Sequence, residues 1–237
     1  MIEISIIIPV YNEEGNISKL LQKINSIKFI NYEIIVVNDG STDNTLSEAS
    51  SQKCNIINLK KNMGKGYAMR EGIKLSKGRY ILFIGGDGQD DPLEIEKLYQ
   101  KIKCGYDLVI GSRFIISDEN LARYSKKAIL PINEFGNKFI TFLINLFFKK
   151  KITDSQAEFK IFSSNKLKLL NLVCDRFEIE TEMLIKSFRN KFNIIEIPVH
   201  RYERNYGKSK LFDTPFGRLL FGIRVIRTII KGYFFWK

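Results

Sequence analysis

The feature that most constrains the fold is a regular alternation of strand-like and helix-like segments through the first half of the chain. Short apolar runs rich in β-branched residues, typical of strands buried on both faces, alternate with segments whose apolar residues recur at helical spacing. The predicted strands cover residues 4–10, 33–37, 55–59, 79–84 and 107–110. The predicted helices cover residues 14–27, 42–51, 64–75 and 93–102. This alternation predicts an α/β fold built on a doubly wound, mostly parallel sheet.

Polar side chains follow four of these strands at the point where each strand ends. The four clusters cover residues 12–14, 38–41, 87–89 and 111–113. Because the carboxyl ends of parallel strands meet at the same edge of a sheet, we expect all four clusters at one edge. Ligands bind at that edge in open α/β sheets, so the candidate site is predicted there.

The second half of the chain is less regular. We predict helices at residues 133–148, 177–188 and 215–236, and strands at 159–162 and 194–199. No internal repeat, low-complexity tract or Pro/Gly/Ser linker interrupts this half. We therefore expect one domain over residues 1–212, followed by a C-terminal amphipathic helical elaboration at 213–237.

The charge of the chain points to an anionic partner. Lys and Arg number 38 against 26 Asp and Glu, which gives a formal net charge of +12. Nucleic acid, acidic lipid and phosphorylated substrates all fit such a balance. We expect no nucleic acid, because no basic run is interleaved with aromatic residues and no DNA- or RNA-binding motif is present. Three separated cysteines and a single histidine form no zinc-site spacing and fit reduced thiols in a cytosolic protein.

The last predicted helix carries a basic face and a broad apolar face. Arg224, Arg227 and Lys231 share one side, and isoleucines, leucine and aromatic residues cover the other. Two interpretations stay open: a helix in a membrane interface, and a helix packed on the sheet. The same two interpretations are open for the predicted helix at 133–148, which is followed by three lysines. With no apolar run of about 18 residues and no signal peptide, we predict a cytoplasmic protein, peripheral at the cytoplasmic face of a membrane and bound to its anionic surface.

Seven motifs, in order along the chain, carry a family resemblance. They are Ile8-Pro9-Val10-Tyr11-Asn12-Glu13, Val37-Asn38-Asp39-Gly40-Ser41-Thr42-Asp43, Asn62-Met63-Gly64-Lys65-Gly66, Asp87-Gly88-Gln89, Gly111-Ser112-Arg113, Asp154-Ser155-Gln156-Ala157-Glu158-Phe159-Lys160 and Arg204-Asn205-Tyr206-Gly207-Lys208-Ser209-Lys210. Together they resemble family 2 glycosyltransferases of the GT-A fold, in the branch of dolichyl-phosphate mannosyltransferases and polyprenyl-phosphate glucosyltransferases. The resemblance implies a GT-A catalytic domain over residues 1–212, with a nucleotide-binding half at 1–113 and an acceptor half at 114–212.

The resemblance implies a nucleotide-sugar donor, linked to UDP or GDP, on the first half of the sheet. The residues implied to hold the base and ribose are Pro9, Tyr11, Glu13 and Asp39. Tyr11 can stack on a base, and the carboxylate of Asp39 can accept a hydrogen bond from a ring N–H. Lys65, in a glycine-containing loop, is implied to meet phosphate.

A divalent cation, Mg²⁺ or Mn²⁺, is implied beside the diphosphate of the nucleotide, with Asp87 as its carboxylate ligand. The family usually has Asp-x-Asp where this chain has Gly85-Gly86-Asp87, so Gly85 replaces the first carboxylate. Asp87 and Gln89 remain as expected ligands, since Mg²⁺ needs only one or two carboxylates besides substrate phosphates and water. Asp90 and Asp91 are interpreted as charges at a helix N-terminus rather than as ligands.

Asp154 is implied to be the acceptor-side carboxylate, acting as a base or orienting the acceptor. Arg113 and Arg204 suit a phosphate acceptor, because a guanidinium group can bind phosphate through two parallel hydrogen bonds. Further acceptor-phosphate contacts are implied for Gln156, Lys208, Ser209 and Lys210. The expected catalytic residues are Asp87, Asp154, Arg113 and Arg204.

Four further polar residues stand near these motifs. Glu158 lies where the family often has glycine. Glu180 and Glu182 are two positions apart on one predicted helix and therefore face different sides, so one of them is a candidate to point to the site. His200, at the end of a predicted strand, is interpreted as structural.

These residues favour inverting transfer of a sugar from a nucleotide-sugar to a polyprenyl phosphate, such as dolichyl or undecaprenyl phosphate. Two alternatives stay open. One is transfer to a saccharide hydroxyl in cell-surface polysaccharide synthesis, which needs a true base. The other is a catalytically weakened homologue that binds nucleotide or lipid, which the glycine at position 85 favours. A homo-oligomer is compatible with each of these functions.

Overall fold

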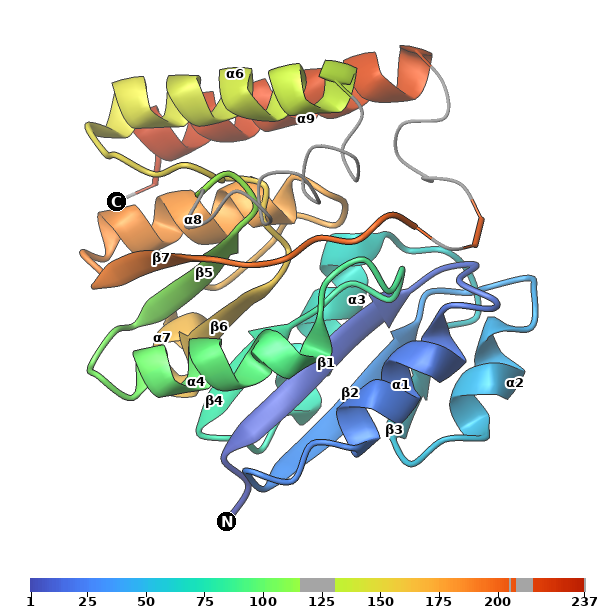
Figure 1. Ribbon diagram of the computed structural model, residues 1–237. Coiled ribbons are helices and arrows are strands. Elements are labelled where there is room, and N and C mark those ends of the chain that lie inside the picture. Colours follow the sequence, from blue (N-terminus) through green and yellow to red (C-terminus); the bar gives the residue numbers. More distant parts are fainter. Residues whose placement is uncertain (116–130, 205, 208–214, 237) are drawn as a thin grey trace.

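The computed structural model describes residues 1–115, 131–204, 206–207 and 215–236. A seven-stranded sheet runs through the molecule in the order β3-β2-β1-β4-β6-β5-β7 (Figure 1). The strands are β1 (Ile4–Val10), β2 (Tyr32–Asn38), β3 (Asn55–Asn58), β4 (Tyr80–Phe83), β5 (Leu108–Ser112), β6 (Lys160–Ser163) and β7 (Ile194–Pro198). All are parallel except β6, which lies between β4 and β5 and is antiparallel to both. The predicted doubly wound, mostly parallel sheet is confirmed.

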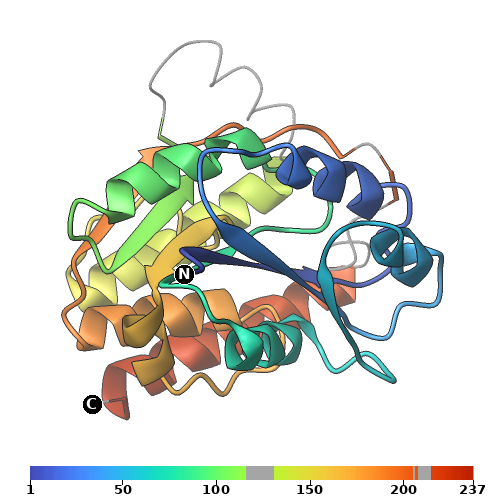
Figure 2. The same cartoon turned by 90° about the horizontal axis from the view of Figure 1, so that it is seen from below.

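Helices cover both faces of this sheet (Figure 2). One face carries α1 (Ile17–Asn25), α2 (Thr45–Ser50), the short 3-10 helix η1 (Pro92–Glu94) and α4 (Ile95–Ile102). The other face carries α3 (Lys65–Leu75), α6 (Pro131–Phe148), α7 (Ser164–Leu169), α8 (Ile179–Arg189) and α9 (Pro215–Phe234). The two faces therefore enclose two separate apolar layers.

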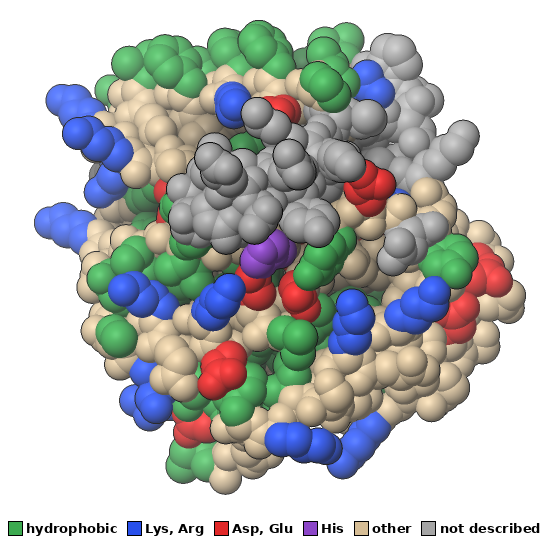
Figure 3. All heavy atoms as spheres, viewed as in Figure 1, with side chains coloured by type: hydrophobic (Ala, Val, Ile, Leu, Met, Phe, Trp, Pro, Cys, Tyr) green, Lys and Arg blue, Asp and Glu red, His purple; other side chains and the backbone are tan. Residues whose placement is uncertain are grey.

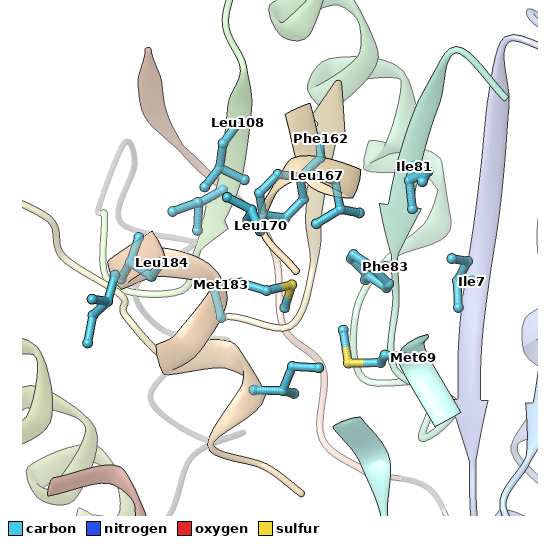
Figure 4. Close-up of a cluster of buried hydrophobic side chains, with 14 of the residues drawn as sticks. Ile7, Met69, Ile81, Phe83, Leu108, Phe162, Leu167, Leu170, Met183 and Leu184 are labelled. Atoms are coloured by element: carbon cyan, nitrogen blue, oxygen red, sulfur yellow. The ribbon is translucent and has the colours of Figure 1, made fainter. Parts of the chain in front are cut away.

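The alternation of side chains along each strand builds these two layers. On β1, Ile7 points into the layer beneath α3 and α8, while Ile6 and Ile8 join the layer beneath α1 and α4. Figure 4 shows the first layer, where Phe83 and Met69 lie close to Ile7. Since both faces are covered, the central strands β1, β2 and β4 are largely apolar along their length, as the sequence predicted.

The predicted elements agree with the structure except at their ends, at one helix that is divided and at one helix that was not predicted. The helix α3 begins at Lys65 because Gly64 adopts a φ of 103°, a conformation outside the helical region. The helix predicted at 93–102 is divided into η1 and α4. The helix α7 was not predicted, because six residues are too few to show a helical period.

The helices α6, α8 and α9 form the part of the molecule farthest from β3, with α6 and α9 side by side beyond α8 (Figure 1). The predicted broad apolar face of α9 is only partly buried against the core. Phe221, Val225 and Ile229 are buried in the core, whereas Ile223 and Ile226 are exposed. The helix thus packs on the core and still presents an apolar stripe to the outside.

A matching stripe runs along the outer side of α6, where hydrophobic side chains gather at the top of the face in Figure 3. We call the two stripes together the apolar ridge. It consists of Ile132, Phe135, Phe139, Phe142, Leu146, Leu219, Ile223, Ile226, Ile230 and Tyr233. Within the described residues, no helix is long and apolar enough to cross a bilayer.

Two glycines in helices give a paired test of the packing. A Cβ at Gly72 of α3 would lie 2.5 Å from Cγ2 of Ile7, whereas a Cβ at Gly136 of α6 would meet nothing within 4 Å. We expect Gly72→Ala to lower the free energy of unfolding by about 1–3 kcal/mol through overpacking. We expect Gly136→Ala to raise it by up to about 1 kcal/mol through helix propensity. Urea unfolding measures both; equal effects would contradict the close approach of α3 to β1.

Candidate active site

The four polar clusters lie at one edge of the sheet, as predicted. They follow β1, β2, β4 and β5, and these strands all point the same way. Asn38 ends β2 and Ser112 ends β5, and the hydroxyl of Ser112 lies 2.7 Å from that of Thr153. The edge therefore collects side chains from distant parts of the sequence at one place.

The segment that follows β7 runs along the loop that follows β4. The amide of Tyr202 donates to the carbonyl oxygen of Gln89 at 2.7 Å, and Nε2 of Gln89 donates to the carbonyl oxygen of Tyr202 at 3.0 Å. An antiparallel bridge between Asp90 and Arg201 continues the pairing. This backbone pairing brings Arg201 and Arg204 to the end of β4.

Asp87 lies between these two arginines. Its Oδ2 is 3.5 Å from Nη2 of Arg201 and 3.5 Å from Nη2 of Arg204, and Oδ1 accepts from the amide of Gln89 at 3.1 Å. Burial works to raise the pKa of Asp87, but the guanidinium groups of Arg201 and Arg204 outweigh burial and lower it. Asp87 is therefore held as a carboxylate.

Arg204 also reaches the end of β1. Its Nη2 donates to Oε1 of Glu13 at 2.9 Å, while Oε2 of Glu13 accepts from Nδ2 of Asn16 at 3.0 Å. Burial raises the pKa of Glu13, and the charge of Arg204 opposes that rise. One guanidinium therefore connects two of the predicted site residues, Glu13 and Asp87.

The carboxylate of Asp39, which follows β2, binds the loop that precedes α3. Its Oδ1 accepts from the amide of Met63 at 2.7 Å and its Oδ2 accepts from the amide of Gly64 at 2.9 Å. Burial raises the pKa of Asp39, with these two hydrogen bonds acting against the rise. Pro9 and Tyr11 lie half-buried at the end of β1 on the same edge. The first predicted group of nucleotide-binding residues therefore meets at the ends of β1 and β2.

Lys65 lies in a network of buried charges at the start of α3. Its Nζ is 3.1 Å from Oε1 of Glu158 and 2.7 Å from Oε1 of Glu180, and Nζ of Lys160 donates to Oε2 of Glu180 at 2.6 Å. Burial lowers the pKa of Lys65, but the two carboxylates outweigh burial and raise it. Burial raises the pKa of Glu158, and the ammonium group of Lys65 opposes the rise. Glu180 points to the site, whereas Glu182 accepts from the amides of Val173 and Cys174.

Asp154 and Arg113 form a second pair at the end of β5. Nε of Arg113 donates to Oδ2 of Asp154 at 2.6 Å and Nη2 donates to Oδ1 at 2.7 Å, so the pair is bidentate. Burial works to raise the pKa of Asp154, but Arg113 outweighs burial and lowers it. The amide of Asp154 donates to Glu196 at 2.9 Å, which fixes its position. Nε2 of Gln156, another predicted residue, donates to Oγ1 of Thr181 at 3.0 Å.

The remaining predicted residues have varied places. Gln89 uses both ends of its amide, because its oxygen accepts from Arg201 at 2.9 Å and its nitrogen donates to Tyr202. His200, interpreted above as structural, has its Nδ1 2.7 Å from Oε1 of Glu94. Asp91 caps η1 by accepting from the amide of Leu93. The predicted Lys208, Ser209 and Lys210 lie outside the described residues.

One residue of the candidate site, Arg201, and one contact, that of Glu158 with Lys65, escaped the sequence analysis. Arg201 pairs with Asp87 and, at 3.0 Å, with Asp90, and its guanidinium is largely buried. Its one signal in the sequence is its position three residues after the end of β7, next to His200. The pairing of Glu158 with Lys65 joins positions far apart in the chain, and no local pattern reveals such a contact. Among the described residues, no group of three or more His, Cys, Asp or Glu side chains forms a complete metal cage.

A model of the family described as "Glycosyl transferase family 2" matches residues 5–170. The chain belongs to this family. The predicted resemblance and the predicted enzyme class, a glycosyltransferase, are confirmed.

Relatives of this glycosyltransferase are known in distant organisms. The chain is 31% identical to a dolichyl-phosphate beta-glucosyltransferase of Drosophila melanogaster, over 94% of this chain and 75% of that protein. It is also 31% identical to a dolichol-phosphate mannosyltransferase of Pyrococcus furiosus, over 88% of this chain but only 59% of that one. Both relatives extend beyond the part that this chain matches.

Solved structures confirm the GT-A fold of this glycosyltransferase. Glucosyl-3-phosphoglycerate synthase from Mycobacterium tuberculosis, in complex with Mn²⁺, UDP and phosphoglyceric acid, superposes with a TM-score of 0.76. The match covers 98% of this chain and 78% of that one, at 19% sequence identity. The superposition shows that the two proteins share a fold. At 19% identity, it does not extend to the acceptor that each protein uses.

Proposed function

We propose that this glycosyltransferase moves a sugar from a UDP- or GDP-linked donor to a polyprenyl phosphate at a membrane surface, with inversion at the anomeric carbon. The observation that carries the proposal is the bidentate pair of Asp154 and Arg113. The carboxylate of Asp154 is buried and accepts two hydrogen bonds from one guanidinium group, which lowers its pKa. Such a carboxylate is a weak base. A hydroxyl acceptor needs a base, whereas a phosphate monoester carries negative charge near neutral pH, since its second pKa is about 6.

The reaction forms one bond and breaks one. A phosphate oxygen of the acceptor attacks the anomeric carbon of the sugar, and the bond from that carbon to the diphosphate oxygen breaks. The electron pair leaves with the nucleoside diphosphate, and no proton has to be removed from the acceptor. In this proposal Asp154 orients Arg113, and Arg113 and Arg204 align the acceptor phosphate. Gln156, Lys208, Ser209 and Lys210 are proposed as further contacts of that phosphate.

On the donor side, Pro9, Tyr11, Glu13 and Asp39 are proposed to hold the nucleotide. Asp87 and Gln89 are proposed to hold Mg²⁺ or Mn²⁺, which would neutralise charge that develops on the diphosphate. The residues fit a divalent cation because Asp87 and Gln89 place a carboxylate and an amide oxygen, both hard ligands, in one short loop at the edge where the strands end. Crystals of the mycobacterial synthase with Mn²⁺ and UDP support the same donor chemistry.

Membrane attachment is proposed through the apolar ridge of α6 and α9. Arg224, Arg227 and Lys231 flank the exposed stripe of α9, and this arrangement suits an anionic lipid surface. The names of the Drosophila and Pyrococcus relatives, which denote transfer to dolichyl phosphate, support an acceptor that resides in a membrane. The cytoplasmic face of the membrane is proposed as the place of action.

One observation favours a second candidate function, a catalytically weakened homologue that binds nucleotide or lipid. Gly85 stands at the end of β4, where a carboxylate is usual in the family. A purified-protein assay separates the candidates: a panel of nucleotide sugars with Mg²⁺ or Mn²⁺ and a short polyprenyl phosphate, read as release of nucleoside diphosphate. Release that requires the lipid and one donor is the expected result. Release with a saccharide acceptor alone, or binding without release, would overturn the proposal.

The apolar ridge makes a separate prediction. Phe139→Glu and Ile226→Glu place charges on its two stripes, where the side chains are 48% and 42% exposed. We expect each variant to bind liposomes of phosphatidylglycerol and phosphatidylcholine about tenfold more weakly, since a large apolar side chain contributes about 1.5–3 kcal/mol on burial. Flotation of the liposomes measures the bound fraction, which is also expected to fall with salt.

Leu75→Glu is the matched control for these variants. Leu75 is 55% exposed at the end of α3 and lies outside the apolar ridge. It should leave flotation unchanged. Equal flotation of all three variants and the unaltered protein would exclude the ridge as the attachment surface.

A further inference from the structure

The carboxylate of Glu158 occupies the place where a side chain at position 85 would begin. A Cβ built on Gly85 would lie 2.8 Å from Oε2 of Glu158 and 3.3 Å from Oδ1 of Asp87. Gly85 follows β4, whereas Glu158 precedes β6, the strand that pairs with β4. Two carboxylates from different segments therefore converge on the space that the missing side chain leaves.

Position 158 shows the reciprocal feature. The chain has a glutamate where the family often has glycine, and a glycine where the family usually has an aspartate. In the structure these two departures are in direct contact, because an added Cβ at Gly85 would collide with the Glu158 side chain. Carboxylates at both positions 85 and 158 would therefore compete for one space. With a carboxylate at neither position, Asp87 would have no second carboxylate beside it in that space.

We propose that Glu158 supplies, from the segment before β6, the metal-binding carboxylate that β4 lacks at Gly85. Glu158 and Asp87 together then give the two carboxylates that suffice for Mg²⁺ or Mn²⁺ when nucleotide phosphates and water complete its shell. This inference rests on the proposed function, because the ion is the one that accompanies the nucleotide-sugar. It also gives a reason why loss of the aspartate need not weaken the enzyme.

The pairing of Lys65 is compatible with this role. Lys65 contacts Glu158 at 3.1 Å but has a closer partner in Glu180 at 2.7 Å. When Glu158 turns to the cation, Lys65 keeps one carboxylate and has charge available for a nucleotide phosphate. Lys65 would therefore exchange Glu158 for a nucleotide phosphate at the same time as Glu158 exchanges Lys65 for the cation.

The test measures binding of Mn²⁺ directly, by loss of the free-ion signal in electron paramagnetic resonance, with UDP present and no acceptor. Three variants are compared: Glu158→Gln, the exchange variant Gly85→Asp/Glu158→Gly, and Glu203→Gln as a control with the same change in charge at an exposed side chain. We expect Glu158→Gln to weaken Mn²⁺ binding by about tenfold or more, since one of two carboxylates is lost. The exchange variant should bind within about threefold of the original protein, and the control should be unchanged.

Glu158 has an alternative role as a simple counter-ion of Lys65, and the same experiment separates the two. A counter-ion role predicts a lower melting temperature for Glu158→Gln with unchanged Mn²⁺ affinity, and that result would overturn the inference. An exchange variant that folds without recovering the ion, or that fails to fold, also overturns it, because the inference requires the two arrangements to be interchangeable. If the unaltered protein binds no Mn²⁺ with UDP, the proposed function fails first, and its failure is thereby distinguished from failure of the assignment to Glu158.

Discussion

Replacement of Arg204 by alanine is expected to reduce sugar transfer by about a hundredfold to a thousandfold, the usual effect of removing one charge-stabilising donor from an active site. Arg204 donates to Glu13 at 2.9 Å and lies 3.5 Å from Asp87, so it stands between the ends of β1 and β4. Its loss removes a cation proposed to align the acceptor phosphate. Steady-state release of nucleoside diphosphate with a short polyprenyl phosphate measures the effect.

Nucleotide binding is the internal control for this variant. Titration of UDP or GDP should give a dissociation constant within a few fold of the original, because Tyr11 and Asp39 are untouched and only the contact of Arg204 with Glu13 is lost. Arg79→Ala is the matched surface control, since Arg79 is exposed just before β4 begins, at the opposite edge of the sheet. Full transfer activity in Arg204→Ala would exclude Arg204 from the reaction. Loss of nucleotide binding with a lower melting temperature would assign it to stability instead.

The second large effect is expected on stability. Arg113→Met leaves the carboxylate of Asp154 buried without its bidentate partner, and breaking such a pair costs about 3–5 kcal/mol. Chemical unfolding at pH 7 measures the loss. The double variant Arg113→Met/Asp154→Leu should recover much of it, because no unpaired charge remains. A single variant as stable as the original would show that solvent reaches Asp154.

The pair of Asp154 and Arg113 also determines how the stability of the protein changes with pH. Arg113 lowers the pKa of Asp154 below its ordinary value of 3.8, so the folded protein holds the charged form more firmly than the unfolded chain. The stabilisation is complete above the unfolded pKa and is lost as the pH falls through the lower folded pKa. We therefore expect the difference in stability between the original and Arg113→Met to shrink under acid conditions. A difference that grows as the pH falls would contradict the direction of this shift.

The sequence predicted the elements that have a local signature. Ile4–Val10 is an apolar run broken only by Ser5, with polar residues after its end, and such a run predicts both the strand β1 and its place at the site. The edge that gathers Glu13, Asp39 and Asp87 followed from parallel strands alone. Short-range periodicity and chain direction were sufficient for this much of the fold.

The partners of the site residues were beyond the reach of local patterns. Lys65 was expected to meet phosphate, and its pairing with Glu158 and Glu180 joins residues that are distant along the chain. Arg201 reaches Asp87 only because the segment after β7 pairs with the loop after β4. The helix α9 was open to two interpretations because a helical wheel shows which residues are apolar and not which of them a neighbouring helix covers.

The antiparallel strand β6 has a consequence for how the protein is made. During synthesis β4 and β5 leave the ribosome before β6, and the place between them belongs to β6. The nascent amino-terminal portion therefore carries an unpaired, apolar strand edge until the later segment arrives, which is the condition that attracts chaperones and promotes aggregation. Asp87 gains its two arginines later still, when the segment after β7 docks. A chain released before that segment docks would therefore lack Arg204 beside Asp87, one of the two arginines proposed to align the acceptor phosphate.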